Sequence, residues 1–389
     1  MCVSSGHTAD LEVPRRRGPR EPTSLRFKGE LLATQLRLSR NLIGRLSQDK
    51  SAGSNIVVSP ASLAAIFSQL EIGASTNMRA AIHKSLGFNG PREKSTADLK
   101  GLQAAVALVQ KPIDHRGPLT LANMIVFDPR SKPFPLALLT LSAAGADVLV
   151  KDITKPETIE LVNAFVRDRT KGMIPKILEA PPDTPGLVAV NALHFKDKWK
   201  AAFDPAQTQL KRFHQLKGKS SDVMLMRIEG AYAFRQNEKF VAVEIPYSAD
   251  GYNMVVITTR NEPAPVSAFS TVTEWLGGEG FTRSPGEISM PRFSTSESIE
   301  LLEAIDALGL RAARQRGDAF QSFSPVPQSI SRIIQKTELR VNEEGTEAAV
   351  ATAVTLTRAA SVDSDFVKMV VDNAFISIGK SKRPTLIGK

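Results

Sequence analysis

The stretch VNEEGTEAAVATAVTLTRAA, residues 341–360, restricts the choice of fold more than any other part of the sequence. After Glu347 come ten residues drawn only from alanine, valine, threonine and leucine, before the charge of Arg358. Local propensity is compatible with a helix that begins at Thr346 and continues through the alanines. The run at 354–357 favours a strand instead, because β-branched residues fit an extended backbone. The stretch therefore has two interpretations, a short helix and an extended segment.

Apolar periodicity on either side of this stretch predicts four helices, at residues 27–48, 59–73, 157–169 and 301–309. The second helix is the best specified, because Ser59 is a candidate N-cap, Pro60 follows at the first helical position and Gly73 can end it. Runs rich in strand-forming residues begin at positions 119, 186, 239 and 251. Several of these runs are apolar without alternation, which is typical of strands buried on both faces. Helices come early and strands dominate late, so the sequence predicts an α+β fold.

The length of the chain, 389 residues, would suggest two or three domains of about 150 residues each. However, no linker rich in proline, glycine or serine divides the chain after residue 24. The sequence therefore predicts one domain over residues 25–389, preceded by a disordered tail over residues 1–24. With 42% apolar and 23% charged residues, the composition is that of an ordinary globular protein.

The sequence offers little for metal or covalent chemistry. Its single cysteine, Cys2, excludes an internal disulfide and makes thiolate zinc sites unexpected. The five histidines lack metal-ligand spacing, and His194 lies in an apolar run where a hydrogen-bonded core histidine is the expected role. The GKS sequence at Gly379 resembles the end of a phosphate-binding loop, but Ala374 stands where that motif needs a glycine. We therefore expect no catalytic site, no metal and no cofactor.

Charge and hydropathy bear on the partners. The net charge of +10 is spread along the chain, and the densest late cluster, at 380–389, lacks the interleaved aromatic residues that bind single-stranded nucleic acid. No run approaches the roughly 20 apolar residues that cross a bilayer. We therefore expect neither a nucleic-acid partner nor a membrane partner. The N-terminus also lacks the apolar core of a secretory signal peptide.

The run NEEGTEAAVATA, residues 342–353, resembles the hinge of the reactive-centre loop of serpins, in which an acidic pair, a glycine, a threonine and a row of small residues follow a strand. Other stretches resemble blocks of the same family in the expected order: NIVVSPASL at 55, NALHFKDKW at 191, EIPY at 244, SMPRF at 289, DNAF at 372 and PTLIG at 384. The similarity spans about residues 26–389, and the ordered series of blocks makes it specific.

This resemblance implies a serpin fold, with a single α+β domain, three β-sheets, about nine helices and an exposed reactive-centre loop at about residues 345–367. It also implies a monomeric inhibitor of serine-type endopeptidases that is not itself an enzyme. In the family a protease attacks the loop and forms an acyl-enzyme, and the cleaved loop then enters the main sheet as a new strand and traps the protease covalently. Most family members act outside cells, whereas no export signal is visible here, so the localisation stays open.

The hinge that the resemblance assigns comprises Glu343, Glu344, Gly345, Thr346, Glu347, Ala348, Ala349, Val350 and Ala351. In an inserted strand, alternate side chains from Thr346 to Leu356 would face the core, and all of them are uncharged. Glu347 would face outward, which avoids the cost of burying an unpaired charge. Non-inhibitory family members often carry bulky, charged or proline residues in the hinge. This hinge therefore favours inhibition over the alternative, a non-inhibitory serpin-fold binding or chaperone-like protein.

The family places the bond that the protease cleaves about fifteen residues along, counting the hinge glycine as the first. From Gly345 this count gives the bond between Ala359 and Ala360, which suits elastase-like or subtilisin-like proteases with small pockets. The alternative lies one residue earlier, between Arg358 and Ala359, and suits a trypsin-like pocket that holds a carboxylate. The segment from 345 to 375 is long by family standards, so the cleaved bond can lie a residue or so away from the counted position. We favour Ala359.

The resemblance also implies a region where the main sheet opens. Ser59, Ser62 and Asn191 match its polar cluster, and an asparagine buried in an apolar strand requires hydrogen-bond partners in any case. Gln335 stands where the family usually has histidine, and glutamine cannot titrate near neutral pH. Trp199 matches the aromatic residue at the top of the sheet, where the loop first enters. Without the resemblance, these residues would be a helix cap, a satisfied core amide and a large core side chain.

Overall fold

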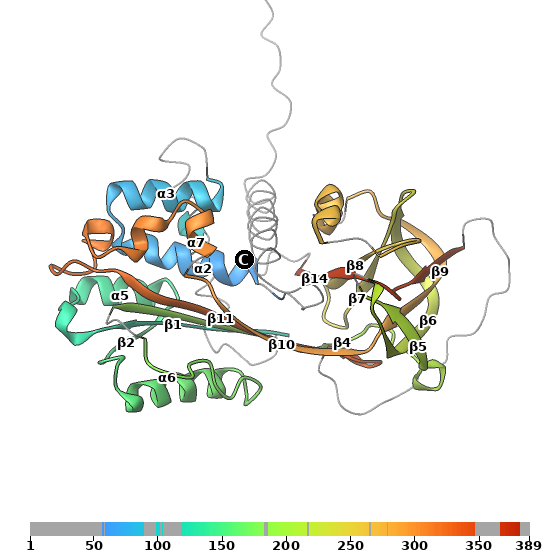
Figure 1. Ribbon diagram of the computed structural model, residues 1–389, viewed down its shortest axis with the longest axis horizontal. Coiled ribbons are helices and arrows are strands. Elements are labelled where there is room, and N and C mark those ends of the chain that lie inside the picture. The colour runs from blue at the N-terminus through green and yellow to red at the C-terminus, as the bar shows by residue number, and fades with distance from the viewer. Residues whose placement is uncertain are drawn as a thin grey trace, which may run out of the picture.

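The computed structural model describes residues 57, 59–88, 99–101, 103, 118–182, 186–215, 218–263, 266–277, 279–302, 304–346 and 366–381. The expected tail at 1–24, the expected helix at 27–48 and residues 347–365 of the loop lie outside these described residues. Figure 1 shows the arrangement of the helices and strands.

The first sheet has seven strands, β1 (Leu119–Phe127), β2 (Asp147–Val150), β3 (Leu187–Phe195), β4 (Asp197–Lys198), β10 (Phe293–Glu300), β11 (Ile330–Val341) and β12 (Gly345–Thr346). Their order is β2, β1, β3, β11, β12 and β4, and β10 pairs with β11 on the side away from β3. The apolar runs expected at 119 and 186 are β1 and β3, which pair antiparallel.

At the centre of this sheet, β3 and β11 lie side by side and run parallel, with Asn191 opposite Gln335. Beyond Val341 the chain reverses, and β12 lies between the end of β11 and β4, with Thr346 opposite Val341 and Gly345 opposite Lys198. Figure 1 shows β11 running along the sheet toward β4. The hinge therefore starts inside the sheet, at one end of the seam between β3 and β11.

The second sheet contains β5 (Gln209–His214), β6 (Ser220–Gln236), β7 (Phe240–Pro246), β8 (Tyr252–Thr259), β9 (Thr282–Pro291), β13 (Val367–Val370) and β14 (Phe375–Ser381). The runs expected at 239 and 251 are β7 and β8. Strand β6 is 17 residues long, and its earlier part pairs with β5 and β9 while its end pairs with β7. Two of the three expected sheets are thus joined through this one long strand.

The described helices are α2 (Pro60–Leu70), α3 (Thr76–Leu86), α5 (Pro135–Ala143), α6 (Pro156–Arg169) and α7 (Ala304–Ala307), together with the 3₁₀ segments η1 (Glu71–Gly73), η2 (Pro129–Ser131), η3 (Pro205–Gln207), η5 (Val266–Gly277), η6 (Arg311–Arg314) and η7 (Asp318–Phe320). The helix expected at 59–73 is confirmed as α2 followed by η1, and the Ser59 hydroxyl accepts the amide hydrogen of Ser62 as an N-cap does. Gly73 is needed there for space, since a Cβ would lie 2.2 Å from the ring of Phe323. Among the described helices, none is long and apolar enough to cross a bilayer.

Two of the remaining expected helices can be compared with the structure. The helix expected at 157–169 is confirmed as α6. The helix expected at 301–309 is shorter, because the amide of Leu301 donates a hydrogen bond to the carbonyl of Ile333 in β11 and so still belongs to the sheet edge. Gly309 has a φ of 79°, which is the left-handed conformation that ends a helix.

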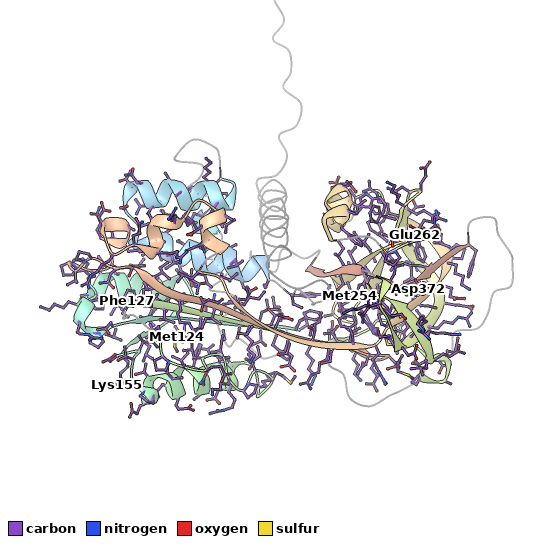
Figure 2. The ribbon with its side chains drawn as sticks, viewed as in Figure 1. Met124, Phe127, Lys155, Met254, Glu262 and Asp372 are labelled. Carbon is purple, nitrogen blue, oxygen red and sulfur yellow. The ribbon has the colours of Figure 1, made fainter. Side chains whose placement is uncertain are left out.

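Helices cover both faces of the first sheet. Figures 1 and 2 show α2, α3 and α7 on one face and α6 on the other, with side chains filling both spaces. On β1, Phe127 packs with the residues of α2, whereas Met124 packs with those of α6, as the alternation of a strand requires. Burial on both faces explains why β1 and β3 are apolar without a polar period.

Candidate functional site

The hinge is described only at its start. Glu343, Glu344, Gly345 and Thr346 lie within the described residues, whereas Glu347, Ala348, Ala349, Val350 and Ala351 lie outside them. Both candidate cleavage positions, formed by Arg358, Ala359 and Ala360, also lie outside them. The geometry that follows therefore concerns the first turn of the hinge and the sheet that it enters.

Asn342 shapes the turn between β11 and β12. Its Oδ1 accepts hydrogen bonds from the amides of Glu344 and Gly345, both at 3.1 Å, and its own amide donates to the carbonyl of Gly345 at 2.9 Å. A side-chain oxygen that binds amides two and three residues on stabilises a tight reversal of the chain. The sequence analysis did not single out Asn342, although an asparagine directly after a strand is a known turn signal.

Trp199 and Phe203 hold the outside of the same turn. The indole Nε1 of Trp199 donates to the carbonyl of Asn342 at 2.9 Å, and its amide donates to the carbonyl of Glu344 at 2.8 Å. The amide of Phe203 donates to the carbonyl of Glu343 at 2.8 Å. The structure thus places Trp199 beside the hinge, where the sequence analysis expected it.

Gly345 lies where the hinge passes closest to β4. A Cβ at this position would lie 2.2 Å from the carbonyl oxygen of Asp197 and 2.6 Å from the Cα of Lys198. Both neighbours are backbone atoms, so they cannot move aside as a flexible side chain would. Glycine is therefore required here by the close approach of two strands.

Thr346 is fully buried, and its hydroxyl lies 2.7 Å from the hydroxyl of Tyr247. The ring of Tyr247 stacks on that of Trp199 with centroids 4.5 Å apart. Burial raises the pKa of the Tyr247 phenol above its ordinary value, so the hydroxyl keeps its proton and can donate to Thr346. Tyr247 belongs to the EIPY block, but the sequence analysis gave it no place in the site.

The first acidic residue of the hinge is anchored as well. Glu343 is largely buried, and its Oε1 accepts a hydrogen bond from the hydroxyl of Thr208 at 2.8 Å. Arg292, which lies between β9 and β10, places its Nη1 3.8 Å from the same oxygen. Together they compensate the buried carboxylate, which would be costly to leave unpaired. Both partners are more than 50 residues away along the chain, so sequence spacing could not reveal them.

The expected sheet-opening cluster is assembled around the N-cap of α2. The amide group of Gln335 makes two hydrogen bonds with the backbone of Ser59: its Oε1 accepts from the amide at 2.7 Å, and its Nε2 donates to the carbonyl at 3.0 Å. The hydroxyl of Ser62 donates to that of Ser59 at 2.8 Å. Gln335 is fully buried, so this pair of bonds fastens α2 to β11 in a dry environment.

Asn191 lies on the neighbouring strand β3. Its Nδ2 donates a hydrogen bond to the Oδ1 of Asn123 on β1, and both side chains are buried. Asn123 was not predicted, although an asparagine inside the apolar run of β1 requires a partner for the same reason as Asn191. The polar cluster thus reaches across three adjacent strands: β1, β3 and β11.

These residues connect the start of β12 with the seam between β3 and β11. β12 enters the sheet at one end of the seam between β3 and β11, and Gln335 lies near the middle of that seam. A longer β12 could continue only if β3 and β11 separated. Across the described part of the chain, no group of three or more histidine, cysteine, aspartate or glutamate side chains is placed to hold a metal ion.

Comparisons with known proteins agree with this geometry. A family model described as serpin (serine protease inhibitor) matches residues 33–387. Antithrombin-III of Mus musculus is 26% identical over 385 residues, which cover 92% of this chain and 80% of that protein. The leukocyte elastase inhibitor of Homo sapiens is 27% identical over 345 residues, which cover 83% of this chain and 89% of that protein.

Solved structures show the same fold at lower identity. Serpin48 of the insect Tenebrio molitor superposes with a TM-score of 0.78 at 22% identity and covers 91% of this chain and 95% of its own. Human thyroxine-binding globulin, in complex with its hormone, superposes with a TM-score of 0.79 at 21% identity and covers 92% of this chain and 96% of its own. One of these proteins is described as a highly specific serpin and the other as a thyroxine-binding globulin, so the likeness in shape extends to proteins with different described activities.

Proposed function

The chain belongs to the serpin family, and from this membership we propose that it inhibits a serine endopeptidase as a suicide substrate. The observation that supports this function most is β12. Gly345 and Thr346 already occupy strand positions between β11 and β4, and Thr346 is buried. The hinge thus begins as a strand at the mouth of the seam that an inserting loop would fill.

In the proposed reaction, the serine oxygen of the protease attacks the carbonyl carbon of a loop residue. The peptide bond breaks, the amine of the next residue leaves with a proton, and an ester joins the protease to the loop. Water would normally hydrolyse this ester. Inhibition requires that the loop insert first and carry the attached protease with it.

The path of insertion starts from Thr346 and runs between β3 and β11. The new strand would follow the direction of β12, antiparallel to β11, and would exchange one parallel seam for two antiparallel ones. Every side chain on the inward face of the hinge is uncharged. The free-energy barrier to loop insertion therefore comes mainly from separating β3 and β11.

For the sheet-opening cluster, we propose that Gln335, Ser59, Ser62 and Asn191 hold the closed seam. The double hydrogen bond between Gln335 and Ser59 ties α2 to β11, and Asn191 is bonded to β1. If α2 slid together with part of the sheet, these hydrogen bonds would either break or move with it. Because an amide has no charge to gain or lose, this step should not depend on pH near neutrality.

The proposed cleaved bond is Ala359–Ala360, and Arg358–Ala359 is the alternative. An alanine fits the small pocket of elastase-like and subtilisin-like proteases, and an arginine fits a trypsin-like pocket. Antithrombin-III and the leukocyte elastase inhibitor are both named as inhibitors, which supports a protease as the partner without choosing its class.

The test is to incubate the protein with elastase, subtilisin and trypsin in turn and to separate the products on a denaturing gel. We expect a covalent complex with at least one of these proteases, together with a released C-terminal peptide. Mass spectrometry of that peptide identifies the cleaved bond. A cleaved loop beside fully active proteases would overturn inhibition and favour the alternative, a serpin-fold binding or chaperone-like protein.

A further inference from the structure

A second exposed site lies far from the hinge, in the connection between α7 and β11. Residues 316–318 read Arg-Gly-Asp, and the side chains of Arg316 and Asp318 are both exposed. Within the described part of the chain, neither of them makes a hydrogen bond or an ion pair. Close by, Arg314 and Asp306 do pair with each other, at 2.8 Å. Two opposite charges are thus held apart on either side of one glycine.

The fold gives no reason for glycine at position 317. Its φ of −176° and ψ of −154° are extended backbone that any residue can adopt. A Cβ built on Gly317 would have no atom within 4 Å. Some of the described glycines do have a local explanation, such as Gly345 by a close approach and Gly309 by a positive φ, whereas Gly379, like Gly317, has none. An unexplained glycine between two unpaired charges suits a site that another molecule approaches closely.

The segment is connected by backbone hydrogen bonds to the residues just before β11. The amide of Gly317 donates to the carbonyl of Gln328 at 3.4 Å, and the amide of Gln328 donates back at 3.3 Å. Two residues after Asp318, the ring of Phe320 is buried and stacks on that of Phe323. The exposed charges therefore stand on an ordered base, which lowers the entropy lost on binding.

The chemistry of the two side chains indicates which kind of partner could bind them. A free carboxylate on an exposed segment is a good ligand for Mg²⁺ or Ca²⁺ that another protein holds with an open coordination position. A free guanidinium pairs with carboxylates through two parallel hydrogen bonds. A polyanion would be attracted by Arg316 but repelled by Asp318, so it fits the pair poorly.

We propose that Arg316, Gly317 and Asp318 form a docking site for an adhesion receptor that binds Arg-Gly-Asp ligands through a receptor-held divalent cation. Asp318 completes the coordination of that cation, Arg316 pairs with an acidic groove of the receptor, and Gly317 leaves room for the receptor's backbone. This site is separate from the proposed inhibition, because it lies before the first residue of β11 whereas the hinge follows the last one, and β11 itself is about 36 Å long. Because the length of β11 lies between them, both could be engaged at the same time.

The test measures binding of the full-length chain to an immobilised ectodomain of an Arg-Gly-Asp-binding receptor in buffer with Mn²⁺. We expect saturable binding that EDTA abolishes and that a free Arg-Gly-Asp peptide competes away. Asp318→Asn and Gly317→Ala should each weaken binding by at least about tenfold, because a site built around a polar group rejects ligands that lack it or cannot approach it. Gly317→Ala is informative because the structure offers space for the methyl group.

Gln315→Ala is the matched control, because Gln315 is an exposed neighbour outside the tripeptide. Its affinity should equal that of the parent chain, and all three variants should keep the same midpoint of thermal unfolding. Equal binding by the parent and Gly317→Ala, or binding that survives EDTA, would overturn the proposal. Binding lost with Arg316→Ala but kept with Asp318→Asn would instead identify a polyanion. None of these readouts depends on protease inhibition.

Discussion

The two ends of the reactive loop are attached to the molecule in different ways. At the N-terminal end, β12 has only two residues: Gly345 pairs with Lys198 of β4, and Thr346 pairs with Asp197 of β4 and Val341 of β11. At the C-terminal end, β13 has four residues paired with β9, Met369 and Val371 are fully buried, and Lys368 lies 3.7 Å from Glu287. The shorter strand pairing lies at the open end of the seam, and the longer one at the edge of the other sheet.

Further bonds strengthen the C-terminal attachment. Asn373, two residues after Val371, is buried and accepts hydrogen bonds from the hydroxyls of Thr258 and Thr259. The amide of His214 donates to the carbonyl of Asp372 at 2.7 Å. The difference between the two ends indicates which part of a cleaved loop is free to move. In the proposed mechanism, the N-terminal part would extend β12, while the C-terminal part would stay with β13.

The largest effect is expected from placing a charge in β12, at the N-terminal end of the loop. Thr346→Arg would bury an unpaired guanidinium beside Tyr247, which costs several kcal/mol and slows insertion by about a hundredfold or more. The acyl-enzyme would then hydrolyse, so the variant should be cleaved as a substrate. The measurement is the yield of covalent complex on a denaturing gel. Glu347→Arg is the control, since that residue would face outward in the inserted strand.

If Thr346→Arg gives as much complex as the parent chain, β12 is not the starting point of insertion. If Glu347→Arg loses complex as well, the side chains do not alternate in the expected way.

The next largest effect concerns the C-terminal end of the loop, at β13. Met369→Ala removes a fully buried side chain from β13 and should lower the free energy of unfolding by about 2–5 kcal/mol. Because β13 does not enter the first sheet, the yield of covalent complex should stay close to that of the parent chain. Denaturant unfolding and the gel assay measure these two quantities. In Lys368→Ala the lost side chain is 64% exposed, so the stability should change much less.

The contrast between the two ends would be wrong if Met369→Ala converted the inhibitor to a substrate while its fold stayed intact.

A smaller effect tests the seam that β12 would extend into. Gln335→His would place a titratable group at a fully buried position, where burial lowers its pKa below the unfolded value of about 6.5. The unfolded chain would then bind the proton more readily. The free energy of unfolding of this variant should have its full value above about pH 6.5. Below that pH it should fall, by at most about 1.4 kcal/mol per pH unit.

The measurement is the midpoint of urea unfolding between pH 5 and 8. The parent chain and an exposed control, Gln321→His, should show little added pH dependence over this range. A flat profile for Gln335→His would mean that the position is not sealed from water.

The smallest effect is expected from removing one hydroxyl group that contacts β12. Tyr247→Phe removes the 2.7 Å hydrogen bond to Thr346 and should cost about 1 kcal/mol of stability. It should also speed the release of β12, which hydrogen exchange at the amide of Thr346 can report. Tyr252→Phe is the control, because the hydroxyl of Tyr252 has no hydrogen bond within the described residues. Equal exchange in both variants would show that the hydroxyl does not hold the hinge.

The sequence predicted the local elements well where a cap or a burial pattern marked them. Ser59 and Pro60 located α2, and the apolar runs located β1 and β3. The helix expected at 301–309 was too long, because the apolar spacing could not show that Leu301 is still bonded to β11. A tertiary hydrogen bond decided that boundary, and local propensity carries no information about it.

The site was predictable only in part. The family resemblance indicated Gly345, Thr346 and Trp199, and the structure brings these three residues together. The residues that hold the hinge have no local signature: Tyr247, which bonds to Thr346, follows the end of β7, and Arg292, which lies near Glu343, lies between β9 and β10. Their contacts follow from sheet topology, which a single sequence with no alignment does not contain.

The attachment of α2 also bears on how the sequence of this protein can change through evolution. Gln335 bonds only to backbone atoms of Ser59, so replacing the serine would alter the helix cap and leave the attachment in place. Position 335 is more restricted. An asparagine would be one methylene too short to reach both backbone groups, and an acidic residue would lack the donor. Among homologues that carry glutamine at 335, position 59 can therefore change without loss of this attachment.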